Sequence, residues 1–254
     1  MNFSNIEDLK KLLDSNIDKI IPQKFINNDP IIVPHNFSNK EDIEISAFLT
    51  SVLAWGNRKI IINKAFYLMN LMYNKPYDFI KNASNKEILT LKKFVHRTFN
   101  GNTTIDFVFA LKNIILEYNN LENLFTQLYL NYGDIKYVLI KFKHLFSKTF
   151  ADLKSYRHIT TPENKSSAKR LNLFLRWMIR KDNKKIDFGL WKNIPPSSLY
   201  IPLDIHTGNT ARKLGILHRK QNDWKAVEEL TNFLKQLDRE DPIKYDFALF
   251  IMDI

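Results

Sequence analysis

The sequence predicts an all-α protein, and three observations support this. Apolar residues recur at spacings of three and four along most of the chain, which is the period of a helix packed on one face. Glycine is scarce, with 6 residues in 254, whereas sandwiches and barrels need many turns. No stretch of alternating apolar and polar residues rivals the helical pattern. Hydrophobic residues make up 44% of the chain, which is enough to build a sizeable core.

The N-terminal region predicts two helices joined by a proline-rich connection. Ser4–Glu7 and Ser38–Glu41 have the capping-box pattern, in which Ser caps the helix and Glu, three residues later, caps the Ser. We expect a helix behind each box. Proline fixes φ and removes a backbone donor, so Pro22, Pro30 and Pro34 predict an extended linker between the two helices.

The rest of the chain predicts further helices with few breaks. Thr103 or Thr104, Asp134 and Asp223 are suitable caps, and Pro242 suits a first helical turn. The expected ranges are 57–73, 85–98, 104–118, 121–131, 134–150, 166–181, 205–215, 224–237 and 242–254. Neither a repeat nor a clear interdomain linker is visible. We therefore predict one all-α domain over 1–254, with two helical lobes and a groove between them. The N- and C-terminal helices would share one lobe, and the middle helices would form the other.

Composition limits the classes of function. The net charge of +11 fits a polyanion partner such as nucleic acid. It also fits a chain rich in Lys, Asn and Ile, in which Lys is simply the default solvated residue. The absence of Cys excludes disulfides, thiolate zinc sites and iron–sulfur clusters. No signal peptide and no apolar run of roughly 18 residues is visible, so we expect a cytoplasmic protein with no membrane partner.

The histidines do not predict a metal site. None of the six has the His-x-x-x-His or His-Glu-x-x-His spacing that places two ligands on one helix face. We therefore expect neither a metal nor a cofactor. The residues concerned are His35, His96, His144, His158, His206 and His218.

The segment 165–185 is strongly basic, and its only acid is Asp182. On a helix, Lys169, Arg176 and Arg180 fall on one face, opposite an apolar face. Such a stripe suits the tracking of phosphates. The alternative is a solvated face, although solvated faces usually mix signs to gain ion pairs. The basic residues are Lys165, Lys169, Arg170, Arg176, Arg180, Lys181, Lys184 and Lys185.

Asp204 stands where a helix begins, about 35 residues after Lys169. An N-cap is the ordinary role for such an Asp and contributes about 0.5–2 kcal/mol. His206 follows and either packs locally or faces a ligand, and Arg212 lies later in the same helix. A carboxylate and a lysine brought together beside a basic surface would suit chemistry on a nucleic acid.

Two family resemblances extend this hypothesis. Leu203–Thr207, continuing through Ala211–Gly215, resembles a segment of the helix–hairpin–helix (HhH-GPD) DNA glycosylases, in which an Asp at a helix start is essential for base excision. Segments 169–178, 187–191, 202–204 and 244–250 resemble DUF2400, a bacterial family related to them. The usual Leu-Pro-Gly-Val-Gly hairpin is replaced here by Thr161–Lys169. The spacing from Lys to Asp looks more like that of the archaeal oxidised-guanine glycosylases, whose hairpin is also unusual.

The resemblance implies an HhH-GPD-like fold with an atypical hairpin, and a bifunctional glycosylase/lyase that acts on an oxidised purine. Lys169 would form the Schiff base and Asp204 would assist it. The partner would be duplex DNA with a damaged base, bound by a monomer close to the nucleoid. The residues expected to bind the substrate are His206, Asp246, Phe250, Trp55 and Asn57. Those expected to bind the nucleic-acid backbone are Lys165, Arg170, Arg176, Arg180 and Arg212.

Some alternatives stay open. A helix end at Trp55 suits a pocket, whereas Trp177 is better explained by core packing than by stacking on a base. The whole chain is also compatible with a non-catalytic DNA-binding protein on the same scaffold. A helical RNA-binding or adaptor protein is the third interpretation.

Overall fold

The computed structural model describes residues 5–252. Within that range the chain consists of α-helices, short 3-10 helices and connections, with three isolated bridges and no β-strand. The all-α class is therefore confirmed. In the same part of the chain, no helix combines the length and the apolar character that a membrane crossing requires.

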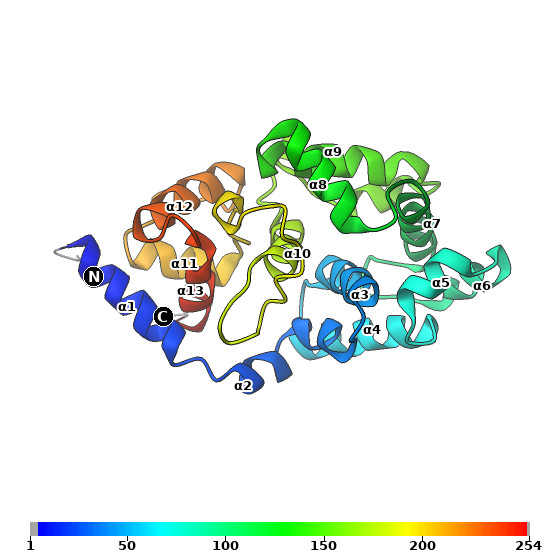
Figure 1. Cartoon of the computed structure of the whole chain (residues 1–254), viewed down its shortest axis with the longest axis horizontal. Helices are drawn as coiled ribbons and strands as arrows, with labels where there is room; N and C mark the ends of the chain where they lie inside the picture. The colour runs from blue at the N-terminus through cyan, green and yellow to red at the C-terminus, as the bar shows by residue number, and fades with distance from the viewer. Residues whose placement is uncertain (1–4, 253–254) are drawn as a thin grey trace. The chain divides into compact units, whose positions relative to one another are not determined.

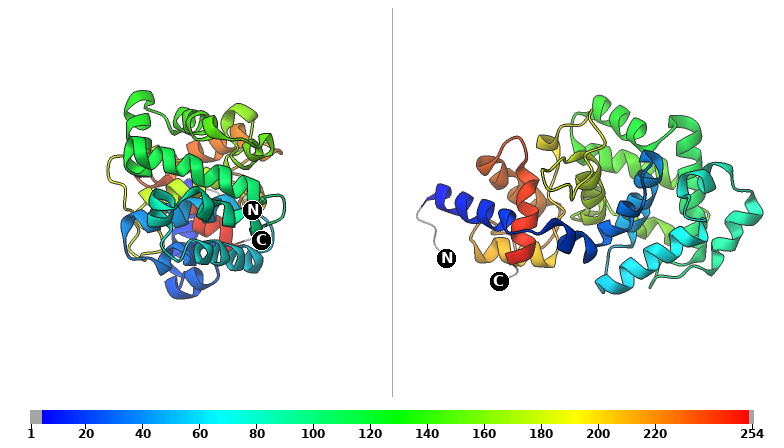
Figure 2. Two further views of the ribbon diagram at one scale, coloured as in Figure 1. Left: turned by 90° about the vertical axis from the view of Figure 1, so that its right-hand side faces the viewer. Right: turned by 60° about the horizontal axis from the view of Figure 1, so that its bottom comes forward.

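The chain divides into two compact units. Unit 1 combines the described residues up to Phe25 with those from Thr161 onward, and unit 2 comprises Ile26–Thr160. Figures 1 and 2 show the first helix, in blue, beside the last helix, in red. The two ends of the chain therefore belong to one unit.

Unit 1 is built from helices of both chain ends. Its centre includes the side chains of Trp177, Trp191 and Tyr245, each at most 1% exposed, so Trp177 is a core residue as the sequence favours. The α-helices are α1 (Ile6–Asp18), which packs on α13 (Tyr245–Met252), together with α10 (Lys169–Ile179), α11 (Ile205–Lys213) and α12 (Trp224–Leu237). The 3-10 helices are η6 (Pro162–Asn164), η7 (Pro196–Ser198) and η8 (Pro242–Lys244).

Unit 2 has a core of phenylalanines. Phe48, Phe107, Phe142 and Phe146 are fully buried, and neighbouring rings lie 5.0–6.4 Å apart. The helices are α3 (Lys40–Leu53), α4 (Arg58–Leu71), α5 (Pro76–Asn82), α6 (Asn85–Thr90), α7 (Gly101–Tyr118), α8 (Leu121–Tyr132) and α9 (Ile135–Phe146). Short 3-10 helices are η1 (Pro30–Ile32), η2 (Pro34–Asn36), η3 (Leu91–Lys93), η4 (Ser147–Thr149) and η5 (Leu153–His158).

The proline-rich connection is helical, so the prediction of an extended linker is wrong. Pro22 begins α2 (Pro22–Asn27), and Pro30 and Pro34 begin η1 and η2. Proline suits these positions because the N–H that it lacks would have no helical partner in a first turn. The Asp29 side chain accepts a hydrogen bond from the Ile31 N–H and so caps η1.

Asn, rather than Ser or Thr, caps several helices. Asn39 caps α3 through the N–H of Asp42, one residue after the expected Ser38. Asn100 caps α7 ahead of the expected Thr103 or Thr104, since an Asn side chain accepts as well as Ser and better than Thr. In α1, Asn5 is the cap, and Ser4 of the expected capping box lies outside the described residues.

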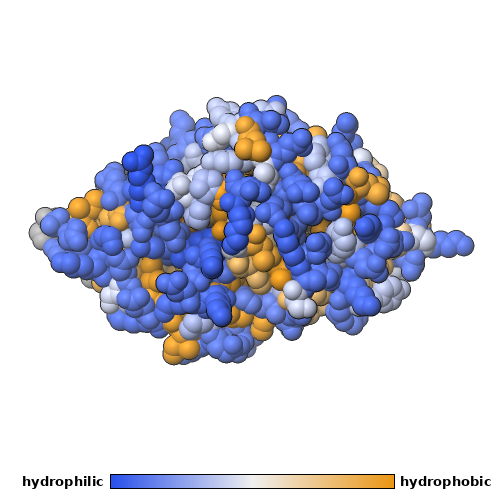
Figure 3. All heavy atoms as spheres, viewed as in Figure 1, coloured by the Kyte–Doolittle hydropathy of each residue, from blue (hydrophilic) through white to orange (hydrophobic). Residues whose placement is uncertain are grey.

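Two other boundaries differ from the prediction. The helix expected over 85–98 ends at Thr90 and continues only as η3, because the chain then turns back on itself between His96 and Phe99. A further helix, α5, begins at Pro76, where the sequence predicts none. In the view of Figure 3, hydrophilic residues cover most of the surface and hydrophobic residues are scattered among them, as the high charge implies.

Candidate active site at Lys169 and Asp204

Asp204 is the N-cap of α11 and uses its two carboxylate oxygens differently. Oδ1 accepts a hydrogen bond from the backbone N–H of Thr207 at 2.9 Å, which is the capping interaction expected from the sequence. Oδ2 lies 3.3 Å from Nζ of Lys169. Asp204 is therefore a cap and an ion-pair partner at once, and the capping bond fixes the direction of the oxygen that meets the lysine.

Lys169 is the first residue of α10. Its side chain is 32% exposed and that of Asp204 is 19% exposed. Both groups thus remain partly accessible, whereas most of α10 is buried. An accessible amine beside a carboxylate fixed by a helix can attack an electrophile once its proton has passed to an acceptor.

The backbone before Lys169 is strained. Lys165 and Ala168 have φ of 57° and 49°, in the left-handed region that non-glycine residues seldom adopt. Ala168 is the N-cap residue of α10 and offers no capping side chain; its N–H instead donates to Oγ of Ser166 at 3.1 Å. Strain of this kind costs on the order of 1–3 kcal/mol per residue and gathers at functional sites.

A second carboxylate lies behind the pair. Asp246 of α13 is 5% exposed, and its Oδ1 accepts a hydrogen bond from Oγ1 of Thr207 at 3.3 Å. Its Oδ2 pairs with Nη1 of Arg176. The pKa of Asp246 is raised to about 6, because burial and the charge of Asp204 raise it more than Arg176, Lys169 and the hydrogen bond from Thr207 lower it. Thr207 therefore links the two acids, through its N–H to Asp204 and its hydroxyl to Asp246.

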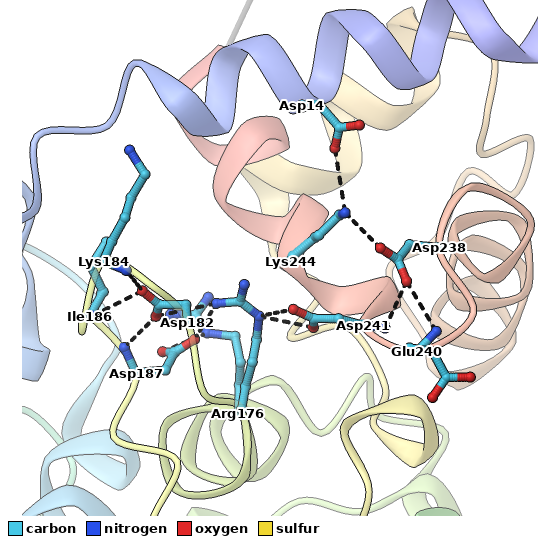
Figure 4. A network of polar contacts seen from close by, with 11 residues as sticks. Asp14, Arg176, Asp182, Lys184, Ile186, Asp187, Asp238, Glu240, Asp241 and Lys244 are labelled. Atoms are coloured by element: carbon cyan, nitrogen blue, oxygen red, sulfur yellow. Dashed lines mark hydrogen bonds and ion pairs between the residues drawn. The ribbon is translucent and has the colours of Figure 1, made fainter.

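Asp246 begins a buried network of charged side chains, of which Figure 4 labels Arg176, Asp187 and Asp241. Arg176 Nε lies 3.3 Å from Asp187, and the other oxygen of Asp187 lies 3.0 Å from Arg180. Arg180 Nε also donates to both oxygens of Asp241 at 2.9 Å. Burial raises the pKa of Asp187, and the two arginines oppose that shift.

Arg176 and Arg180 therefore do not form an exposed face of cations. The prediction that they belong to such a face is wrong for both. They are 4% and 5% exposed, and their carboxylate partners come from other segments of unit 1. A cavity of about 260 Å³ borders the network at Arg180, Asp182 and Asp241. Neither Lys169 nor Asp204 lines it.

Three other residues of unit 1 were expected to bind the nucleic-acid backbone, namely Lys165, Arg170 and Arg212. Lys165 is exposed, and Arg170 is half-buried; burial lowers the pKa of Arg170 to about 10. Arg212 serves the structure, since it donates to the carbonyl of Arg219 at 2.8 Å and to Oδ1 of Asn222 at 2.5 Å. Asn222 in turn donates to the carbonyl of Asp204 at 2.9 Å, so Arg212 supports the cap indirectly.

His206 and Phe250 lie near each other in unit 1. Their ring centroids are 6.5 Å apart, His206 is exposed and Phe250 is half-buried. Trp55 and Asn57 belong to unit 2. There, Asn57 caps α4 by accepting the N–H of Ile60 at 3.3 Å, and Trp55 is partly exposed.

Sequence reasoning missed Thr207 and Asp187. Both are polar and buried, at 1% and 3% exposed, and each connects charged partners. Each also lies within a segment that carries the family resemblance. A polar residue in such a segment, next to apolar neighbours, is the signal that would have found them.

Comparison with known protein families assigns most of this chain. The family described as "Protein of unknown function (DUF2400)" matches residues 29–254. The chain belongs to the DUF2400 family. The DUF2400 match includes Lys169, Asp204 and Asp246. No curated protein and no solved structure matches the chain.

Proposed function

We propose that this DUF2400 protein is a DNA glycosylase/lyase that acts through a Schiff base between Lys169 and C1′ of a damaged nucleotide. The observation that carries the proposal is the 3.3 Å approach of Lys169 Nζ to Asp204 Oδ2, with both side chains partly accessible. The resemblance of 203–207 to the glycosylase segment supports the reaction class. A damaged purine in duplex DNA is the substrate class.

The chemistry needs an amine, a proton acceptor and a stabilising negative charge. Asp204 accepts a proton from the ammonium group of Lys169, and the neutral Nζ attacks C1′. The glycosidic bond breaks, and its electron pair leaves with the base, which takes up a proton. The sugar ring then opens as Nζ forms the C1′ imine and O4′ becomes a hydroxyl. The target nucleotide must leave the base stack first, because C1′ is not accessible within the duplex.

The carboxylate of Asp204 also stabilises positive charge that develops on the sugar. Its orientation is fixed before the reaction by the N–H of Thr207 and by Asn222 on the neighbouring carbonyl. A charge that is oriented in advance needs no reorganisation when the transition state forms, which is the main source of electrostatic catalysis.

Trapping with borohydride tests the proposal. Duplexes with one abasic site or one oxidised guanine are incubated with the protein, and hydride reduces the imine to a stable amine that appears as a covalent adduct on a denaturing gel. We expect Lys169→Ala to abolish the adduct on both duplexes. Lys225→Ala, which removes an exposed lysine of α12, should leave it at the level of the unmodified protein.

Asp204→Asn separates the two half-reactions. Asn caps a helix as well as Asp does, so the fold should persist. We expect the variant to lose most of its excision of oxidised guanine but to keep slower trapping on the abasic site, where no base has to leave and a solvent base can accept the proton of Lys169. If no adduct forms with either duplex while DNA binding persists, the glycosylase/lyase proposal is refuted, and the chain is a non-catalytic DNA-binding protein.

A further inference from the structure

Trp55 differs from the other tryptophans of the chain. Trp177, Trp191 and Trp224 are 0%, 1% and 4% exposed, whereas Trp55, just after α3, is partly exposed. Exposing an indole forgoes the burial of a large apolar surface. The exposure therefore calls for a reason beyond packing.

Two buried histidines support the Trp55 ring from within unit 2. The ring centroid of His96 lies 4.8 Å away in an edge-on arrangement, and that of His158 lies 5.8 Å away. His96 and His158 are 2% and 3% exposed. The indole thus contacts two buried rings while part of it faces solvent, and we call this arrangement the Trp55 platform.

Arg97 lies beside this platform. It follows His96 at the tip of a tight turn, in which His96 and Phe99 exchange backbone hydrogen bonds of 2.8 and 2.9 Å. Arg97 has φ of 54°, and its guanidinium lies against Gly56, where a Cβ atom would clash with Nη1. Gly56, the residue after Trp55, therefore makes room for the cation next to the indole.

Lys64 brings a second positive charge to the same place. The ring of Tyr67 lies 6.1 Å from that of Phe94, two residues before His96, so the segment 94–97 lies beside Tyr67 as well as beside Trp55. Burial lowers the pKa of His96, and the charges of Arg97 and Lys64 act in the same direction. Nζ of Lys64 lies 5.8 Å from the ring centroid of Tyr67, which is 39% exposed. The segment 94–97 thus has an aromatic ring and a cation on each side, Trp55 with Arg97 and Tyr67 with Lys64.

The two cations come from stretches of the chain that contain no acid. The chain has no Asp or Glu between Glu44 and Asp78, nor between Glu87 and Asp106. These two stretches supply Trp55, Arg97, Lys64 and Tyr67. A solvated surface usually mixes signs, whereas a surface for phosphates excludes acids.

We propose that Trp55, Tyr67, Lys64 and Arg97 form a binding surface for single-stranded DNA, with a base stacked on the indole and phosphates at the cations. Proteins that bind single strands combine these two elements, because every base has a π-face and every linkage a charge. The inference rests on the proposed function for the choice of DNA, while its structural support lies wholly in unit 2.

Intrinsic fluorescence tests the surface directly, because Trp55 is the tryptophan that solvent and ligand reach. We expect a ten-nucleotide oligothymidine to quench the emission, and the quenching to disappear in Trp55→Phe. With a labelled oligothymidine and anisotropy as the readout, Trp55→Ala should bind at least about fivefold more weakly, which is the lower end for the loss of one stacked base. No quenching, or unchanged affinity in Trp55→Ala, would overturn the proposal.

Charge variants show what the surface recognises. Arg97→Gln and Lys64→Gln should each weaken binding and make the slope of log affinity against log salt shallower by about 0.7, as expected for one phosphate contact with a single strand. Lys225→Gln, the charge-matched control in unit 1, should leave both unchanged. An oligoglutamate that quenches Trp55 as strongly as oligothymidine would also overturn the proposal, because the surface would then accept any polyanion.

Lys169→Ala keeps this inference separate from the proposed function. The variant should bind oligothymidine like the unmodified protein even though it forms no covalent adduct. Quenching without any adduct in the unmodified protein would refute the glycosylase/lyase proposal and support the binding surface for single-stranded DNA. An adduct without quenching would support the glycosylase/lyase proposal and refute the binding surface.

Discussion

Two groups of cations, one in each unit, differ in what surrounds them. In unit 1, Arg176 and Arg180 are buried, and carboxylates from other segments pair with both. In unit 2, Arg97 is exposed and Lys64 half-buried, in stretches of chain that contain no acid. A basic stripe is therefore structural where the fold brings acids to it, as for Arg176 and Arg180, and an exposed cation in a stretch without acids is the better candidate for binding a ligand.

Because the network of unit 1 is buried, it acts mainly on the stability of the fold. Desolvation of an arginine and a carboxylate is costly, and the pair offsets that cost only with good geometry and complete partners. Removing one member leaves a buried charge without compensation. A cation at the surface remains hydrated, and its loss changes stability little.

Matched substitutions in the two units should have very different effects on stability. We expect Arg176→Met to lower the free energy of unfolding by about 3–5 kcal/mol, because Asp187 and Asp246 lose a buried partner. Arg97→Met should change it by no more than about 0.5 kcal/mol. Urea titrations of both variants at pH 7 measure the difference. Similar losses in the two variants would contradict the assignment of the cations to different roles.

The sequence could not reveal the network, for a physical reason. The stripe on α10 looked unpaired because its own helix has no acid, and the acids that pair with it come from residues 182–187, 241 and 246. Such pairings depend on tertiary packing, which no local period encodes. The apolar periods, by contrast, encode the burial of helices locally, and so most helices of the fold could be predicted.

The candidate site was more predictable than its surroundings. Asp204 could be placed at a helix start from its neighbours, and Lys169 came from the basic segment together with the family resemblance. The 3.3 Å approach of the two charges and the link through Thr207 to Asp246 required the fold. Several helix boundaries were predicted wrongly at prolines and asparagines. A Pro that can break a helix is also well suited to begin one.

The free energy of unfolding should depend on pH through Asp246 of unit 1. Its pKa is raised to about 6 in the folded chain, so the folded state binds a proton that the unfolded state releases near pH 4. The stabilising contribution of the protonated carboxyl is complete below pH 4 and is lost as the pH rises through 6. At about 1.4 kcal/mol per pKa unit, the loss reaches about 3 kcal/mol.

Asp246→Asn should remove this dependence. We expect the variant to gain stability relative to the unmodified protein, by up to about 3 kcal/mol, as the pH is raised from 4 to 7. Chemical denaturation at several pH values would measure the difference between the two curves. Parallel curves over this range would show that Asp246 titrates as an ordinary surface acid, which its burial argues against.

The smallest effect concerns two glycines of unit 2 that both have a positive φ but lie in different surroundings. Gly56 and Gly133 have φ of 100° and 69°, and a Cβ atom would meet Arg97 at Gly56 but nothing within 4 Å at Gly133. Replacement by Ala should cost each about 1 kcal/mol, because a side chain is strained at positive φ. The Arg97 guanidinium can move away from a new Cβ, so stability should not separate the variants.

Binding of oligothymidine should separate them. Displacement of Arg97 from its place beside Trp55 removes a phosphate contact, so Gly56→Ala should bind severalfold more weakly, with a salt dependence like that of Arg97→Gln. Gly133→Ala has no cation to displace and should bind like the unmodified protein. Equal affinities in the two glycine variants would mean that the position of Arg97 over Gly56 does not matter for a ligand. The surface cations of unit 2 would then be no more functional than the buried ones of unit 1.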